Sequence, residues 1–180
     1  MRYLSMLLLV IMLATLQGCA GGGGHAADRR SSGTQIEDET IEKLSSTRIK
    51  EKYSDSIQVT ITSFNRFVLI TGEALSEEIK TDIERIVRSV PNVKKTSNEV
   101  FVGSLSSSSA RRNDSGVSGK IKSEIRKNKT LNSGAVQIIT SRGIVYLMGF
   151  ATHAEATAIS TLASRTTGAQ KVVRVFEYID

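Results

Sequence analysis

The stretch VTITSFNRFVLITGEA, residues 59–74, returns later in the chain as VQIITSRGIVYLMGFA, residues 136–151. The two copies align at a constant offset of 77 residues and share apolar residues, a glycine and an alanine at equivalent positions. The equivalent pairs are Val59 and Val136, Ile61 and Ile138, Val68 and Val145, Gly72 and Gly149, and Ala74 and Ala151. A repeat that occurs only twice indicates a duplicated domain rather than a solenoid.

Each copy has the pattern of a β-hairpin. Two runs rich in β-branched residues flank a short turn, which is Asn65-Arg66 in the first copy and Arg142-Gly143 in the second. The Arg142-Gly143 pair suits a tight turn that needs positive φ. Neither Gly72 nor Gly149 belongs to a phosphate-binding glycine loop, so we interpret both as positions that need room or positive φ.

A helix is predicted on either side of each hairpin. Before the hairpins, apolar residues share one side of helices expected to begin at Asp38 and Ser115; they are Ile41, Leu44 and Ile49, and then Val117, Ile121 and Ile125. After the hairpins, similar stripes contain Ile79, Ile83, Ile86, Val87 and Val90, and then Ile159, Leu162 and Ala163. A final strand, NEVFV or KVVRVFEYI, closes each unit.

The predicted fold class is therefore α+β, with two tandem small α-β-β-α-β domains. Each domain is expected to hold a mixed three-stranded sheet with two helices on one face. The first domain is placed at residues 36–103 and the second at 115–180, and the serine-rich segment 104–114 is interpreted as a linker. Domains of about 65 residues bury too little surface for more than marginal stability, so we expect the two to pack together.

The N-terminal residues 1–18 have the pattern of a lipoprotein signal peptide. Arg2 precedes the apolar run MLLLVIMLA, which is shorter than the roughly 20 residues that span a bilayer. The following LQGC resembles a bacterial lipobox, which implies that Cys19 becomes the first mature residue and carries diacylglycerol and an acyl chain. Ala20 follows where aspartate would imply inner-membrane retention, so the resemblance implies the periplasmic face of the outer membrane. Residues 19–35 are interpreted as a flexible tether.

The element order, the glycine after each hairpin and the entries to the last strands, NVKKTSNEV and GAQKVVRVF, resemble the BON-domain family. This resemblance covers nearly all of residues 38–180. With the lipobox and the two copies, the chain is similar to dual-BON outer-membrane lipoproteins. The resemblance implies a non-enzymatic envelope protein that binds anionic phospholipid through its second BON domain and supports outer-membrane integrity.

The positive charge of the chain is concentrated in its second half. Residues 36–109 carry 10 Lys and Arg against 12 Asp and Glu, whereas residues 110–180 carry 11 against 5. Five cations surround a single Glu124 in the first helix of the second domain; they are Lys120, Lys122, Arg126, Lys127 and Lys129. The corresponding helix of the first domain mixes Glu39, Glu42 and Glu51 with its cations. We therefore expect the second domain to hold the stronger site for an anionic partner.

Lys122, Arg126 and Lys129 form one helical stripe beside the apolar stripe of Val117, Ile121 and Ile125. A basic amphipathic helix of this kind can lie on an anionic, phosphatidylglycerol-like lipid surface. The expected contact residues are Gly116, Val117, Lys120, Ile121, Lys122, Arg126, Lys127 and Lys129. The alternative is that the apolar stripe faces the sheet and the lysines are simply solvated. Because Gly116 stands where lipid-binding relatives can carry an aromatic residue, and the chain has no Trp, we expect anchoring that is either weaker or more electrostatic.

Other classes of function find little support in the sequence. A single cysteine and two separated histidines, His25 and His153, disfavour a metal site, and no nucleophile lies near a base. We therefore expect no cofactor and no enzymatic activity. Export disfavours nucleic acid as a partner. An envelope adaptor that binds a protein partner through its BON domains is the alternative function.

Overall fold

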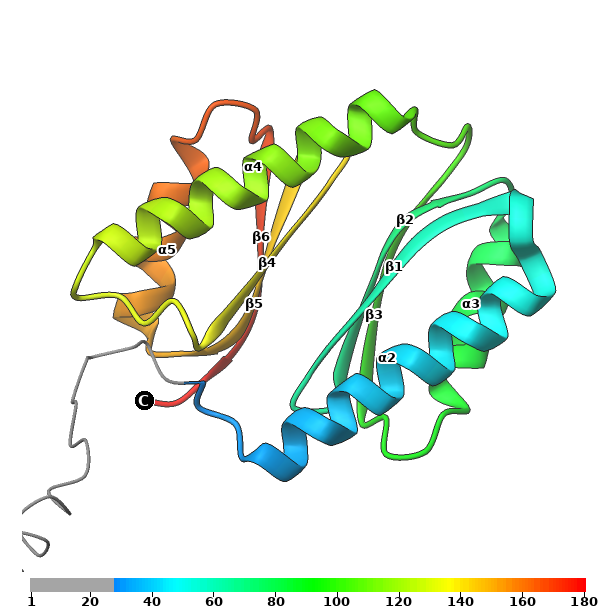
Figure 1. The fold of residues 1–180 in the computed structure, drawn as a ribbon, viewed down its shortest axis with the longest axis horizontal. Helices are drawn as coiled ribbons and strands as arrows, with labels where there is room; N and C mark the ends of the chain where they lie inside the picture. The colour runs from blue at the N-terminus through cyan, green and yellow to red at the C-terminus, as the bar shows by residue number, and fades with distance from the viewer. Residues whose placement is uncertain (1–27) are drawn as a thin grey trace, which may run out of the picture.

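The computed structural model describes residues 28–180, so Cys19 and the signal peptide lie outside the described residues. Two units follow each other with the same order of elements (Figure 1). The first unit contains α2 (Ser32–Tyr53), the 3-10 turn η1 (Ser54–Ser56), β1 (Ile57–Phe64), β2 (Phe67–Ala74), α3 (Glu77–Arg88) and β3 (Lys95–Val102). The second contains α4 (Ser108–Lys127), β4 (Val136–Ser141), β5 (Ile144–Ala151), α5 (His153–Ser164) and β6 (Lys171–Tyr178). The predicted α+β class with two tandem units is confirmed.

Each unit has one three-stranded mixed sheet, as expected. The second strand of each hairpin is central: β2 pairs antiparallel with β1 and parallel with β3, and β5 pairs in the same way with β4 and β6. The parallel pairs require a crossover, which α3 supplies in the first unit and α5 in the second. Both helices of each unit cover the same face of its sheet (Figure 1).

The hairpin turns use backbone conformations that few residues adopt. Asn65 and Arg66 have φ of 52° and 66°, and Arg142 and Gly143 have φ of 54° and 73°. Two successive residues with positive φ match the twist of the flanking strands. The turn at Asn65-Arg66 therefore forms without a glycine.

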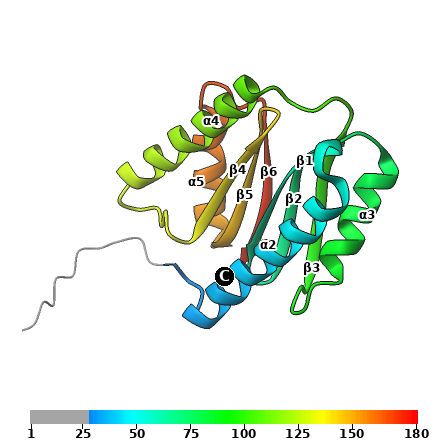
Figure 2. The same ribbon diagram turned by 45° about the vertical axis from the view of Figure 1, so that its right-hand side comes forward.

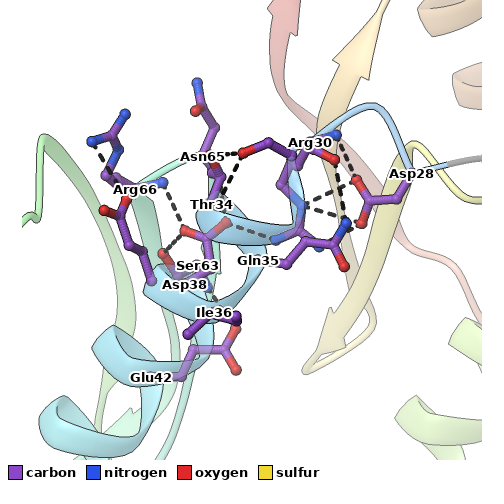
Figure 3. Close-up of polar contacts among 12 residues, drawn as sticks. Asp28, Arg30, Thr34, Gln35, Ile36, Asp38, Glu42, Ser63, Asn65 and Arg66 are labelled. Atoms are coloured by element: carbon purple, nitrogen blue, oxygen red, sulfur yellow. Dashed lines mark hydrogen bonds and ion pairs between the residues drawn. The ribbon is translucent and has the colours of Figure 1, made fainter.

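One aspartate from each first helix holds the neighbouring turn in place. The carboxylate of Asp38 accepts hydrogen bonds from the two turn N–H groups of the first unit at 2.8 and 2.7 Å (Figure 3). Asp114 does the same in the second unit at 2.8 and 2.9 Å. These bonds satisfy backbone donors that point away from the ladder. The repeat therefore includes a side-chain contact between helix and turn.

The first helix of each unit begins earlier than expected. The hydroxyl of Ser31 caps α2 and that of Ser107 caps α4, so the predicted starts at Asp38 and Ser115 are wrong. Serine is a favoured N-cap, and both segments supply one seven or eight residues before the predicted start. As a consequence, most of the segment 104–114, interpreted as a linker, belongs to α4.

Gly72 and Gly149 stand where a side chain would collide with the adjacent strand. Their φ values are 116° and 149°. A Cβ atom would lie 2.0 Å from the carbonyl oxygen of Gln58 in the first unit and 2.1 Å from that of Ala135 in the second. Both interpretations, the need for room and the positive φ, are confirmed.

Three apolar clusters hold residues 28–180 together. One lies between the helices and sheet of the first unit, and a second lies between those of the second unit. The third joins the two sheets and contains Phe64, Phe67, Leu69, Tyr146 and Met148. The two units thus pack through the sheet faces that their helices leave free, and the layers run helix, sheet, sheet, helix (Figure 2). Leu44, expected on the apolar side of α2, is 37% exposed, and Ser45 is buried instead.

Candidate membrane-binding surface

The apolar stripe of α4 faces its own sheet. Val117 is 6% exposed and Ile121 and Ile125 are fully buried. The expectation that Val117 and Ile121 contact lipid is therefore corrected, because packing against the sheet already uses both side chains. Gly116 is exposed, and no atom lies within 4 Å of the position that a Cβ would take.

Three of the predicted cations lie together on one flank of α4. Lys122, Arg126 and Lys129 line a groove of about 1020 Å³. Lys129 follows the last helical residue, Lys127, so it lies in the connection to β4 rather than on the helix itself. The other lining residues are Asn128, Thr130, Leu131, Asn132, Ser133, Gly134, Val136, Gln137 and Glu155. The structure therefore brings the three cations together in one groove, although the predicted helical stripe ends before Lys129.

The remaining two cations lie on the opposite flank. Lys120 and Glu124 line a second depression with residues of α5 and with Arg165, which follows the end of that helix. Lys127 forms an ion pair with Glu124 at 2.6 Å. The predicted set of cations is thus divided by the helix, and one member of it is already neutralised. Cations in the last turn, such as Arg126 and Lys127, also complement the helix dipole.

The cations of the groove have no carboxylate partner within the described residues. None of Lys122, Arg126 and Lys129 forms an ion pair in residues 28–180. In the first unit, by contrast, Asp38 pairs with Arg30 and Lys52 pairs with Asp82. Uncompensated positive charge therefore gathers at this flank of α4.

Arg29 reaches the rim of the same groove from the start of the described chain. Its guanidinium donates two hydrogen bonds to the carboxylate of Glu155, at 2.8 and 2.6 Å, and a third to the carbonyl of Phe150 at 2.8 Å. The hydrogen bond from Arg29 lowers the pKa of Glu155 to about 2, and the N–H of Thr152 contributes. Glu155 and Thr152 also form the capping box of α5.

Arg30 binds the other unit. It pairs with Asp28 and Asp38, both at 2.7 Å (Figure 3). Its guanidinium also lies 4.2 Å above the ring of Phe64. Sequence reasoning assigned Arg29 and Arg30 to the tether and missed these contacts. The available signal was a pair of adjacent arginines at the end of a segment made mostly of small residues.

Comparison with known proteins identifies the family. Residues 35–104 and 113–180 each match the BON domain. The chain belongs to the BON domain family. The two units are accordingly BON domain 1 and BON domain 2.

Two curated relatives extend over most of the chain. The outer membrane lipoprotein DolP of Haemophilus influenzae is 31% identical over 185 residues, which cover 96% of this chain and 96% of DolP. The 21 kDa hemolysin of Actinobacillus pleuropneumoniae is 26% identical over 87% of this chain and 83% of its own length. Among solved structures, CdsD, a structural protein of the type III secretion system of Chlamydia trachomatis, aligns with 13% identity over 81% of this chain and 93% of its own. Its TM-score is only 0.30.

The near full-length similarity to DolP confirms the predicted localisation at the outer membrane and the assignment to dual-BON lipoproteins. Lipid attachment at Cys19 stays a prediction. Within residues 28–180, no helix has the length and apolar character needed to cross a bilayer. The same residues hold no group of three or more His, Cys, Asp and Glu side chains arranged for a metal ion.

Proposed function

We propose that this envelope lipoprotein binds anionic phospholipid through the α4 groove of BON domain 2 and thereby supports outer-membrane integrity. The observation that carries the proposal is the arrangement of Lys122, Arg126 and Lys129, which share one groove and lack carboxylate partners in the described chain. Phosphate groups, with their negative charge and acceptor oxygens, are the natural complement of such a site.

The expected binding energy is modest and depends on salt. Each basic residue close to an anionic bilayer contributes about 1 kcal/mol, so three give about 3 kcal/mol. Screening by salt acts over about 8 Å at physiological ionic strength, which weakens such a contact. A lipid anchor compensates by holding the domain near the membrane at high effective concentration.

The contact is electrostatic because α4 offers no apolar wedge. Val117 and Ile121 are committed to the core, and Gly116 contributes no side chain. The basic flank would therefore lie against the headgroups without entering the acyl region. Three residues that the sequence predicts as lipid contacts, Gly116, Lys120 and Lys127, therefore lie at the periphery of the proposed contact.

Charge reversal in the groove tests the proposal. We expect Lys122→Glu combined with Arg126→Glu to reduce sedimentation of the 20–180 fragment with phosphatidylglycerol-containing vesicles by roughly two orders of magnitude in affinity. The matched control is Lys43→Glu with Lys50→Glu, which makes the same change in charge at exposed positions of α2. Equal binding by the groove variant and the control would refute the assignment.

A protein partner on BON domain 1 is the second candidate. The observation in its favour is that α2 exposes two large apolar side chains, Ile36 at 65% and Leu44 at 37%. A photo-crosslinking residue at Leu44 would then capture an envelope protein in intact cells, and the reversal at Lys122 and Arg126 would leave the capture unchanged. Capture only from α4 positions would exclude this candidate.

A further inference from the structure

The end of the tether is bound to BON domain 2, although it continues covalently into BON domain 1. Arg29 lies two residues before Ser31, the N-cap of α2 in BON domain 1. Within the described residues, however, its side chain binds Glu155 and the carbonyl of Phe150, both in BON domain 2. Its neighbour Arg30 binds Asp38 of BON domain 1. The segment from residue 28 to 31 therefore crosses the boundary between the domains.

The same crossing occurs at the pseudo-equivalent place in the linker. Ser107 caps α4 as Ser31 caps α2, and the hydroxyl of Ser106 donates to Glu73 of BON domain 1. Glu73 and Phe150 occupy equivalent positions at the offset of 77 residues. Each first helix is thus preceded by a segment that contacts the end of the other domain's central strand. The linker joins the two domains covalently, so it has to contact both. The tether joins only BON domain 1, and its contact with BON domain 2 depends on Arg29.

The contact that Arg29 makes is stronger than an ordinary surface ion pair. The side chains of Arg29 and Glu155 are 28% and 18% exposed, and the guanidinium binds both oxygens of the carboxylate. Bidentate arginine–carboxylate pairs add geometric specificity to their charge. We name Arg29, Glu155 and the carbonyl of Phe150 the tether clasp.

The tether clasp lies beside the basic groove. Glu155 is itself a lining residue of the groove that contains Lys122, Arg126 and Lys129. We propose that the tether clasp fixes the exit of the tether at the groove rim, so that BON domain 2 is held against the anionic bilayer. This inference rests on the proposed function for the identity of the lipid-facing surface, and it assigns to Arg29 a positioning role.

The length of the tether makes its exit point decisive. From Cys19 to Asp28 the chain advances nine residues, which span at most about 32 Å when fully extended. A body of this size has a radius of gyration of about 15 Å and is about 38 Å across. A lipid on Cys19 would thus keep the surface around the exit point close to the membrane and the opposite surface away from it.

The first experiment tests the tether clasp without any lipid bilayer. Spin labels are attached at Ala27→Cys and Thr157→Cys in the full lipidated chain in neutral detergent. Pulsed electron paramagnetic resonance then measures the distance between the tether and α5. We expect a narrow distribution for the parent chain, at least a twofold broadening for Arg29→Gln, and a partial recovery for Arg29→Lys. Arg88→Gln, which breaks the Arg88–Glu84 pair of α3, is the matched control and should leave the distribution narrow. A broad distribution in the parent chain, or no broadening in Arg29→Gln, overturns the tether clasp.

The second experiment tests orientation on a membrane. In nanodiscs of phosphatidylethanolamine and phosphatidylglycerol, a spin label at Thr130, which lines the groove, is compared with one at Thr81 on α3. The measurement is the relaxation that a headgroup-bound paramagnetic ion causes at each label. We expect the relaxation at Thr130 to exceed that at Thr81 in the parent chain. The ratio of the two relaxation rates should fall about threefold or more in Arg29→Gln. An unchanged ratio in a variant whose tether distances have broadened overturns the orienting role.

The two proposals fail in different ways. Vesicle binding that survives Lys122→Glu with Arg126→Glu would remove the proposed function, while a narrow tether distance sensitive to Arg29 would leave the tether clasp standing. Loss of vesicle binding in that variant would support the proposed function. A tether distance that does not respond to Arg29→Gln would at the same time remove the tether clasp. Urea unfolding of Arg29→Gln and Arg88→Gln in parallel separates a change of tether position from a general loss of stability.

Discussion

At the scale of single residues, two aspartates act as anchors for neighbouring turns. Asp38 is 1% exposed and also accepts hydrogen bonds from Ser63 and Arg30. Aspartate is a good N-cap, so its position at the head of an apolar stripe favoured that interpretation. Asp38 and Asp114 recur at an offset of 76 residues, one short of the hairpin offset. Their near-equivalent positions in the repeat indicate a common role, which is to bind the hairpin turn.

Replacing these aspartates should affect stability unequally. We expect Asp38→Asn to lower the free energy of unfolding by about 2 kcal/mol, because it removes one of the two carboxylates that pair with the largely buried cation of Arg30 and leaves only Asp28. Asp114→Asn should cost only about 1 kcal/mol, since only hydrogen bonds to backbone N–H groups change. Urea denaturation of both variants measures the difference. Equal losses would show that the ion pair with Arg30 adds nothing to the shared turn contact.

At the scale of elements, the pattern predicted the hairpins, α3 and α5 closely, because their turns and apolar stripes are marked locally. It did not predict where α2 and α4 begin, since serine-rich segments are compatible with both a linker and a capped helix. For the site, the spacing placed Lys122 and Arg126 on one flank. It could not separate a lipid-facing Val117 or Ile121 from a buried one, because both environments favour the same apolar side chains.

Two helical glycines give a test of α4 as an element. Gly116 and Gly119 lie within the helix, and no atom lies within 4 Å of either Cβ position. We expect Gly116→Ala with Gly119→Ala to raise the stability of BON domain 2 by about 2 kcal/mol, because alanine loses less backbone entropy in a helix. Thermal unfolding measures the gain, and vesicle binding should stay unchanged. A loss of binding would mean that the bare helix backbone takes part in the lipid contact.

At the scale of the whole molecule, the unbroken apolar runs FVLI and IVYLM of the central strands have a clear cause. Leu69 and Met148 point into the layer between the sheets, whereas Val68 and Leu147 point toward the helices. A strand buried on both faces shows no alternation of apolar and polar residues. The sequence thus contained evidence for sheet-on-sheet packing, but not for which sheet faces meet, because any covering layer would require the same residues.

A charge placed in this layer should separate the domains without unfolding them. Met148 is 1% exposed, and Met148→Lys would bury an unpaired cation there at a cost of several kcal/mol. We expect the two domains to tumble independently, which nuclear spin relaxation detects as a shorter correlation time. Ser123→Lys adds the same charge on the exposed side of α4 and serves as the control. A single correlation time equal to that of the parent chain would contradict an essential role for this layer.

The tether clasp also makes stability depend on pH. The pKa of Glu155 is lowered from 4.5 to about 2, mainly by its hydrogen bond from Arg29. A carboxyl group whose pKa is lowered on folding stabilises the folded state when the pH is above its pKa in the unfolded chain. This contribution is lost as the pH falls through its pKa in the folded chain. We therefore expect the stability difference between the parent chain and Arg29→Gln to be complete above pH 5 and to vanish near pH 2, as measured by urea unfolding. A difference independent of pH would contradict this origin.

The segment bound by the tether clasp has a neighbour at the far end of the sequence. The carboxylate of Asp180 binds the backbone and ring of His153 at the start of α5, two residues from Glu155. The first and last described residues thus lie near each other (Figures 1 and 2). A circular permutant that joins Asp180 to Asp28 through a short glycine linker and opens the chain at Ser106 would begin with BON domain 2. It would keep both sheets, both helix layers and the layer between them.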